Sequence, residues 1–146
     1  MTSPDPNGEE PFMPHETLGY ALKRAQQAMR SYMDRRLKEI GLTAPQYAVL
    51  ASLEVEPGAS NAALARLAFV TPQTMQVMLV KLEDAGFIER KPDADHGRIQ
   101  RTTLTARGQT VVKKAHDIAR QAEEVARDAA SPDAVRMLKR VAEALA

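Results

Sequence analysis

The sequence predicts a mainly α-helical fold with one small β-hairpin, in a single domain. Alanine and leucine are abundant and only 7 of the 146 residues are glycine, a composition that favours helices. Apolar residues recur at spacings of three and four along most of the chain, which is the period of a helix. Residues 87–104 instead have the pattern of two short strands around a loop that contains Pro, Asp and Gly.

The N-terminal part is expected to form a mobile tail and then a long helix. Residues 1–14 are rich in Pro, acidic and small polar residues, which is typical of a mobile segment. From Thr17 to Ile40 the apolar positions form one stripe, and Gly41 supplies a left-handed stop. The stripe packs against the chain's own core or, for a part of its length, against a second subunit. We favour the second subunit for part of it.

Three shorter helices are expected next. Thr43-Ala44-Pro45-Gln46 is a capping box and begins a helix that runs to Glu54. Ser60 caps a short helix that should bury Leu64 and Leu67. After a turn at residues 69–70, Thr71 caps a third helix with Pro72 in its first position, and Gly86 ends it.

This third helix has two different sides. Stepping 100° per residue places its core residues on one side: Met75, Met78, Leu79, Leu82 and Ala85. The opposite side is mostly polar and holds Gln73, Gln76, Val77, Val80, Lys81 and Asp84, with Thr74 at the margin. The two valines lack an obvious core partner, although single exposed apolar residues are common.

The predicted hairpin pairs residues 87–91 with 98–104 and has basic arms. Arg90, Lys91, Arg98 and Arg101 lie on or beside the strands, and we expect Asp95 in the loop to orient one of the arginines. Thr105 then caps a long helix to about residue 129, and Ser131-Pro132 begins the last helix.

A capped helix followed by a basic hairpin is suited to double-stranded DNA. The helix can enter the major groove while the hairpin reaches the neighbouring minor groove. Gln can pair bidentately with adenine, apolar side chains can touch the thymine methyl group, and Arg98 suits the minor groove. The candidate DNA-binding residues are Ser60, Thr71, Gln73, Thr74, Gln76, Val77, Lys81, Arg90, Lys91, Arg98 and Arg101.

The ordered set of motifs resembles the MarR family of winged helix-turn-helix transcriptional regulators over roughly residues 17–130. The segments that carry the resemblance are 42–50 (LTAPQYAVL), 63–65 (ALA), 71–74 (TPQT), 82–90 (LEDAGFIER), and Leu104-Thr105 with Gly108. The chain departs from the family pattern twice. The wing tip carries His96-Gly97-Arg98 where Asp-Arg-Arg is frequent, and Val77 stands where many members have Arg. Both departures remove positive charge from the DNA-facing side.

The resemblance implies a homodimer that represses nearby genes from a pseudo-palindromic operator. Residues 42–107 would form the DNA-binding part, and residues 15–41 and 108–146 the dimerisation helices, within one domain of residues 15–146. A small aromatic or phenolic acid would relieve repression by binding between the two parts. Tyr20, Arg24 and Tyr47 are the candidate lining residues.

Other functions have weaker support. The absence of Cys excludes disulfides, thiolate metal sites and thiol-based peroxide sensing. The three histidines are widely separated and no catalytic motif is present, so we expect no enzyme, cofactor or metal site. With no membrane span or secretory signal, a cytoplasmic location is expected. A nonspecific DNA organiser and a helical interaction module remain as alternatives.

Overall fold

The computed structural model describes residues 12–146, so most of the predicted tail lies outside the described part. The mainly helical fold class with a small sheet is confirmed. The elements, in order, are η1 (Pro14–Glu16), α1 (Leu18–Leu37), η2 (Lys38–Ile40), α2 (Ala44–Val55), β1 (Ala59–Ser60), α3 (Asn61–Leu67), α4 (Pro72–Asp84), β2 (Ile88–Pro92), β3 (Gln100–Leu104), α5 (Ala106–Ala129) and α6 (Ala134–Leu145).

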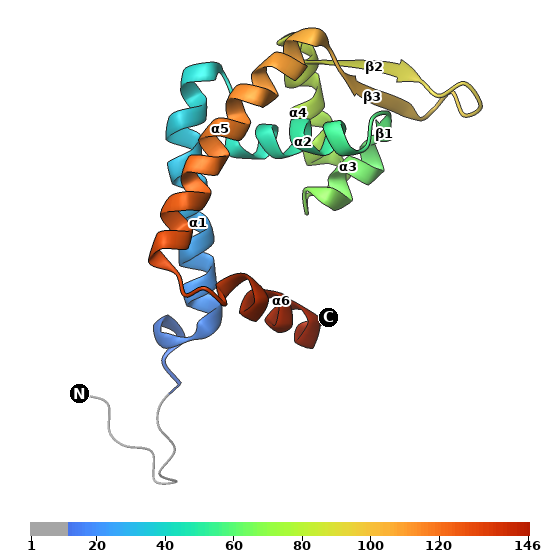
Figure 1. Cartoon of the computed structure of the whole chain (residues 1–146). Coiled ribbons are helices and arrows are strands. Elements are labelled where there is room, and N and C mark those ends of the chain that lie inside the picture. Colours follow the sequence, from blue (N-terminus) through green and yellow to red (C-terminus); the bar gives the residue numbers. More distant parts are fainter. Residues whose placement is uncertain (1–11) are drawn as a thin grey trace.

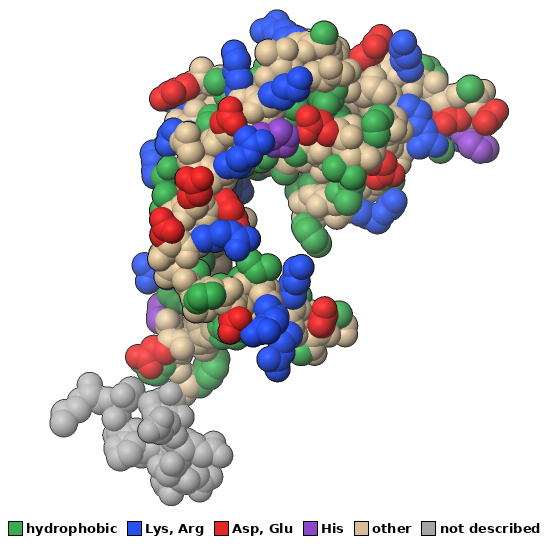
Figure 2. Space-filling model, in the orientation of Figure 1, with side chains coloured by type: hydrophobic (Ala, Val, Ile, Leu, Met, Phe, Trp, Pro, Cys, Tyr) green, Lys and Arg blue, Asp and Glu red, His purple; other side chains and the backbone are tan. Residues whose placement is uncertain are grey.

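The elements form a head on a stalk (Figure 1). The stalk consists of α1 and α5, which run side by side. The head, residues 42–105, holds α2, α3, α4 and the sheet at one end of the stalk. The opposite end, which we call the stalk end (residues 12–28 and 125–146), carries α6. Head and α6 project to the same side and leave an open space between them (Figure 2).

The start of the head follows the predicted local signals. Gly41 has a φ of 79° and ends the first helical segment, with Leu42 N–H donating to the Leu37 carbonyl at 3.1 Å. The Thr43 capping box forms with both of its hydrogen bonds. Asp34 on α1 accepts a bond from the Ala44 N–H at 2.6 Å and thereby ties the stalk to the first turn of α2.

The sheet contains one strand more than expected. Its antiparallel order is β1-β3-β2, with Ala59 opposite Thr102 and Ile88 opposite Leu104. Two residues of β1 are too few to show an alternating pattern. The expected second strand begins at Gln100 rather than at residue 98, because Asp93 N–H bonds to the Ile99 carbonyl and Ile99 N–H bonds to His96. The last helix begins at Ala134, after a turn at residues 131–133.

One core joins the head to the adjacent half of the stalk. It is built from aliphatic side chains, among them Leu37, Leu50, Leu64, Leu79 and Val112. The prediction that Leu67 is buried was wrong, since it is 51% exposed at the last turn of α3, where Leu64 and Ala65 meet the core instead. At the stalk end, by contrast, α6 has no buried residue. None of the described helices combines the length and the apolar character that crossing a membrane requires.

Candidate nucleic-acid interface

The helix α4 is well defined at both ends. Thr71 accepts a bond from the Thr74 N–H at 3.1 Å, and Pro72 occupies the first turn, as predicted. At the other end Gly86, with a φ of 78°, donates to Glu83, and Phe87 N–H donates to Leu82. This pair of bonds is a Schellman motif, so the length of α4 is set by its own sequence.

The two sides of α4 separate as expected. Met75, Leu79 and Leu82 are buried, and Met78 and Ala85 are half-buried. The candidate contact residues of α4 all lie on the exposed surface: Gln73, Thr74, Gln76, Val77 and Lys81. Val77 is 57% exposed, and Val80 is exposed beside it. The head therefore presents a mixed polar and apolar helix face that is exposed among the described residues.

Ser60 and Asn61 hold the preceding helix in place. Ser60 ends β1 and accepts a bond from the Ala63 N–H at 3.2 Å, so the hydroxyl already serves as a cap. The side-chain amide of Asn61 donates to the Pro72 carbonyl at 3.3 Å and links α3 to the start of α4. Sequence reasoning missed Asn61, although its place one residue after the Ser60 cap is a usable signal.

The turn between α3 and α4 contains a strained aromatic residue. Phe69 has a φ of 54°, in the left-handed region that a side chain with a Cβ disfavours. Its side chain is 96% exposed. Val70 beside it is partly buried and packs on the core, as an apolar residue just before a helix cap often does.

Phosphate binding requires an exposed cation, whereas the guanidinium of Arg90 is mostly buried and bonded to other side chains of the head. Its guanidinium bonds to Glu83 at 3.1 Å and to Gln76 at 3.2 Å, and its side chain is only 13% exposed. The hydrogen bond from Arg90 lowers the pKa of Glu83. Sequence reasoning missed Glu83, which lies seven positions after Gln76 and hence on nearly the same side of α4.

Asp93, rather than Asp95, organises the wing. Its carboxylate pairs with Arg101 at 2.7 Å and accepts the backbone N–H groups of Asp95 and His96 at 2.8 and 3.0 Å. The Arg101 bond, followed by the two backbone bonds, lowers the pKa of Asp93 to about 2. Because the pKa of Asp93 is lower in the folded chain than its ordinary value of 3.8, these bonds contribute to folding stability at pH values above 3.8. This contribution is lost as the pH falls through about 2.

The remaining basic residues of the wing are exposed. Arg98 lies in the loop before β3, and Lys91 lies on β2 with an ion pair to Glu89 at 3.5 Å. Arg101 is half-exposed but already paired with Asp93. Of the four predicted wing cations, Arg98 is therefore the one among the described residues for which no acidic partner is found.

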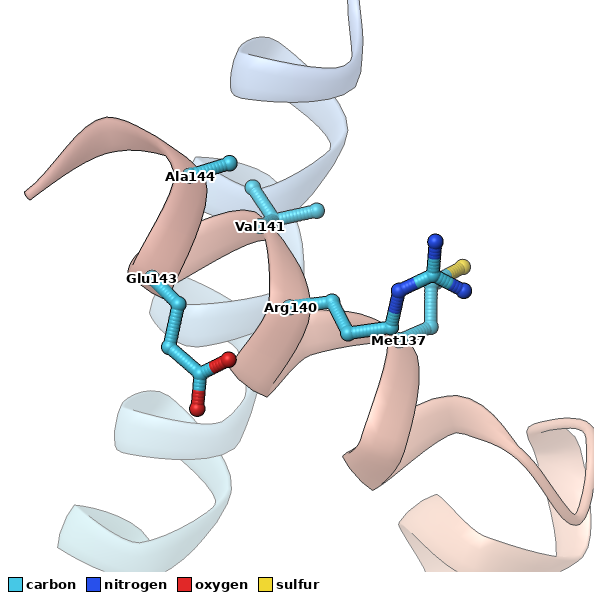
Figure 3. Close-up of a pocket in the computed structure, with 5 residues that line it drawn as sticks. All are labelled: Met137, Arg140, Val141, Glu143 and Ala144. Atoms are coloured by element: carbon cyan, nitrogen blue, oxygen red, sulfur yellow. The ribbon is translucent and has the colours of Figure 1, made fainter.

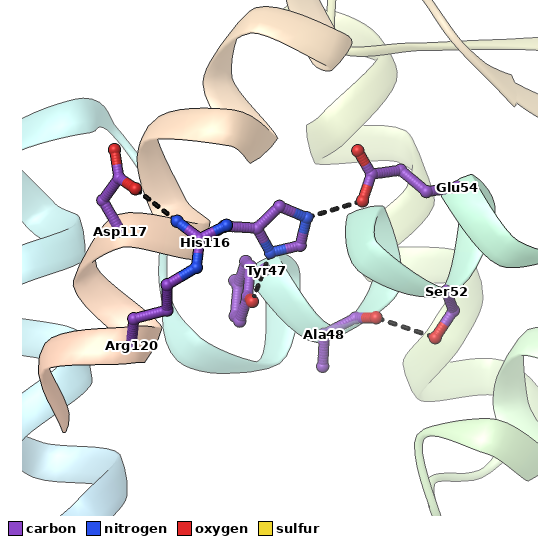
Figure 4. A network of polar contacts seen from close by, with 7 residues as sticks. All are labelled: Tyr47, Ala48, Ser52, Glu54, His116, Asp117 and Arg120. Carbon is purple, nitrogen blue, oxygen red and sulfur yellow. Dashed lines mark hydrogen bonds and ion pairs between the residues drawn. The ribbon is translucent and has the colours of Figure 1, made fainter. Parts of the chain in front are cut away.

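A second polar site connects the head to the stalk (Figure 4). The His116 ring on α5 bonds to the Tyr47 hydroxyl at 2.7 Å and to Glu54 at 2.6 Å, both on α2. Burial, and then the charge of Glu54, raises the pKa of Tyr47, while Arg120 opposes them. An open hollow of about 570 Å³ lies here, lined by Tyr47, His116, Ala119, Arg120, Glu123 and Glu124.

Two of the three candidate ligand residues lie elsewhere. Tyr47 lines this hollow, whereas Tyr20 and Arg24 are exposed on the first half of α1 and do not line it. The ring of His116 bonds to two side chains of α2, so this histidine holds α2 against α5. Another hollow, of about 640 Å³, lies against α6 and is lined by Met137, Arg140, Val141, Glu143 and Ala144 (Figure 3).

Comparisons with known proteins agree on one family. A family model described as MarR family matches residues 40–99. The HTH-type transcriptional repressor Rv2887 of Mycobacterium tuberculosis is 43% identical over 106 residues, which are 73% of this chain and 76% of that protein. The transcriptional regulator HosA of Escherichia coli is 38% identical over 74 residues, which are 51% of this chain and 55% of that protein.

Solved structures show the same fold. The crystal structure of Rv2887 with salicylic acid matches with a TM-score of 0.67 at 39% identity and covers 89% of this chain and 96% of that one. A MarR variant from Escherichia coli in complex with operator DNA matches with a TM-score of 0.79 at 21% identity, over 88% of this chain and 92% of that one. The second likeness is one of fold alone.

Proposed function

Because the chain belongs to the MarR family, whose relatives named above are transcriptional regulators and not enzymes, we propose that it is a sequence-specific DNA-binding repressor. In this proposal residues 42–107 read an operator, and residues 15–41 and 108–146 join two copies of the chain. The observation that carries it is the exposed face of α4, together with the wing residue Arg98, which has no acidic partner among the described residues.

The proposed contacts divide into two groups. Gln73, Thr74, Gln76 and Val77 face the base edges of a major groove, where amide, hydroxyl and apolar groups each have a matching base feature. Lys81, Lys91 and Arg98 neutralise phosphates or enter the minor groove. Ser60, Thr71, Arg90 and Arg101 act mainly by holding these residues in position, since each is already bonded within the head.

Homodimer formation is supported by the stalk end. Leu18 on α1 and Val135, Met137, Leu138 and Leu145 on α6 are exposed in a single chain. An exposed set of large apolar side chains typically marks an interaction surface. Two copies joined there would place two recognition helices on one duplex, about 34 Å apart for successive half-sites.

An aromatic acid is the proposed effector, and the hollow at Tyr47 is the proposed site. Its volume lies within the range of small-molecule sites, about 300–1,000 Å³. Arg120, which pairs with Asp117 on the exposed surface of α5, offers a cation for a carboxylate, and Tyr47 offers an aromatic ring. Glu123 and Glu124 favour a ligand with few further negative charges. The relative Rv2887 has been solved with salicylic acid.

Relief of repression would act through the bonds of His116. They join α2 of the head to α5 of the stalk, so a ligand in this hollow is placed to change the angle between head and stalk. Such a ligand lowers DNA affinity only to the extent that it prefers the wrong spacing of the two heads.

The first experiment measures DNA binding of the purified full chain. Fluorescence anisotropy compares the DNA upstream of its gene with a scrambled duplex at several salt concentrations. A regulator should bind its operator about 10³-fold or more tightly than the scrambled duplex. Equal affinities with equal salt slopes would instead support the nonspecific organiser.

The second experiment tests the effector site. Salicylate should raise the melting temperature of the wild type and release it from the operator. Arg120→Ala should lose both effects. Arg136→Ala is the matched control, because Arg136 forms the same kind of exposed ion pair, three residues from its acid, as Arg120 does with Asp117. An Arg120→Ala protein that still responds fully would place the effector elsewhere.

A further inference from the structure

One end of the Gln76 side-chain amide, the carbonyl oxygen, already has a hydrogen-bond partner in the folded chain. Arg90 Nη1 lies 3.2 Å from Gln76 Oε1. A guanidinium has hydrogen-bond donors and no acceptor, so the Gln76 atom that faces it has to be the carbonyl oxygen. The amide nitrogen, with two donor hydrogens, has no partner among the described residues. The contact therefore fixes which end of the amide is offered to solvent or to DNA.

Arg90 is held firmly enough to impose this orientation. Glu83 accepts two bonds from it, one from the backbone N–H at 3.2 Å and one from Nη2 at 3.1 Å. Its side chain is only 13% exposed, although the buried Nε has no hydrogen-bond partner among the described residues. Glu83 and Gln76 lie seven positions apart, about two helical turns, so Arg90 spans the same side of α4 that carries both.

This arrangement changes what Gln76 can read. Bidentate reading of adenine requires the amide oxygen to accept from adenine N6 while the amide nitrogen donates to N7. In this chain the oxygen already accepts from the Arg90 guanidinium, so an approaching N6 amino group would have to share it with a charged donor. The two N–H donors of the amide have no such competitor among the described residues. Guanine presents two acceptors, N7 and O6, in the major groove and fits this donor pair best.

We propose that Arg90, positioned by Glu83, makes Gln76 a donor-only reader that selects guanine over adenine at the base pair it faces. The inference rests on the proposed function, since it presupposes that α4 lies in a major groove. Glu83 and Arg90 are positioning residues here: they act on the base through Gln76.

The test measures base preference rather than affinity alone. The full chain and its variants are used to select operators randomised at each position, and Kd values are then measured for guanine and adenine duplexes. The position read by Gln76 is the one at which Gln76→Ala loses discrimination. The wild type should prefer guanine there, and Arg90→Met should shift the guanine-to-adenine ratio toward adenine by about tenfold, within the range of one bidentate contact.

Two further variants keep the test decisive if Arg90→Met folds poorly. Glu83→Gln, which loosens Arg90, should shift the ratio in the same direction by a smaller factor. Gln76→Glu keeps an acceptor for Arg90 but removes both donors, so the guanine preference should disappear. Lys91→Met is the matched control, since it removes the same charge at the next position of β2. It should weaken all duplexes alike and leave the ratio unchanged.

The outcomes separate the two proposals. A wild type that prefers adenine at this position, or an Arg90→Met ratio equal to that of the wild type, overturns the role of Arg90. A Gln76→Ala protein that keeps every base preference overturns it as well. If the wild type shows no preference for any sequence, the proposed function itself fails, and this result is visible before any variant is made.

Discussion

The head and the stalk end both carry aliphatic side chains, but one chain buries those of the head far more completely than those of the stalk end. In the head, aliphatic residues such as Leu50, Leu64 and Leu79 are fully buried, and each helix start has a capping side chain. At the stalk end α6 buries no residue, and its first position has no side-chain cap bond. The apolar core of the head is closed within one chain, whereas the apolar surface of the stalk end is not covered by any of the described residues.

This difference separates two kinds of sequence signal. Caps, Gly stops and turns act within a few residues, so they specify local structure in one chain. An apolar stripe specifies only that something apolar must cover it. Substitutions in the two regions test whether a second copy covers the apolar surface of the stalk end and whether the core of the head needs no such partner.

The largest effect is expected from a charge placed on α6. Leu138→Asp should convert a homodimer into monomers, because a carboxylate is costly to bury at an apolar contact. Losing one of two linked half-site contacts should then weaken operator binding about 100-fold or more. Sedimentation velocity measures the oligomeric state, and anisotropy measures binding.

Val55→Asp is the control for this variant, since Val55 is a highly exposed residue of the head. It should leave the oligomeric state unchanged. A Leu138→Asp protein with the sedimentation coefficient of the wild type would show that α6 is not part of the contact between copies.

The same substitution at two glycines should have opposite effects in the two regions. A Cβ on Gly108, at the start of α5, would lie 1.9 Å from the Phe87 carbonyl oxygen, so Gly108→Ala should lose about 3 kcal/mol or more of folding free energy. A Cβ on Gly19 meets nothing within 4 Å, and Gly19→Ala should gain up to about 1 kcal/mol from helix propensity. Urea unfolding of both variants checks the sign. Equal effects would mean that the head tolerates backbone shifts at this contact.

Much of the head could be predicted because its signals are local. Thr43, Thr71, Thr105 and Gly86 each mark a boundary that the structure confirms. The Gly108 position in the family pattern also acquires a physical reason, namely the close approach of Phe87.

What could not be predicted depends on tertiary contacts. The two-residue strand β1 exists only because it pairs with β3. The bonds of Arg90 to Glu83 and of Arg101 to Asp93 depend on how β2 and the wing fold back. From the sequence alone, both arginines were expected to contact DNA. The candidate DNA contacts themselves remain predictions that only binding measurements test.

A smaller effect is expected from the exposed arginine of the wing. Arg98→Ala should weaken binding to all duplexes and reduce the salt slope by about 1, because one phosphate or minor-groove contact is lost. Arg127→Ala, which removes the same charge at the last turn of α5, should leave the slope unchanged. Equal slopes for Arg98→Ala and the wild type would remove the wing from the reading surface.

The smallest effect concerns the turn at Phe69, whose side chain is 96% exposed. Its left-handed backbone costs about 1 kcal/mol, and its ring is almost fully exposed in the described part of the chain. Phe69→Asn should therefore raise the melting temperature by about 2–4 °C, since Asn tolerates this conformation. Phe69→Ala keeps the unfavourable φ and should bring no gain. If Phe69→Asn lowers the melting temperature instead, the ring makes a stabilising contact, and the turn at Phe69 joins the apolar surfaces that the described residues leave uncovered.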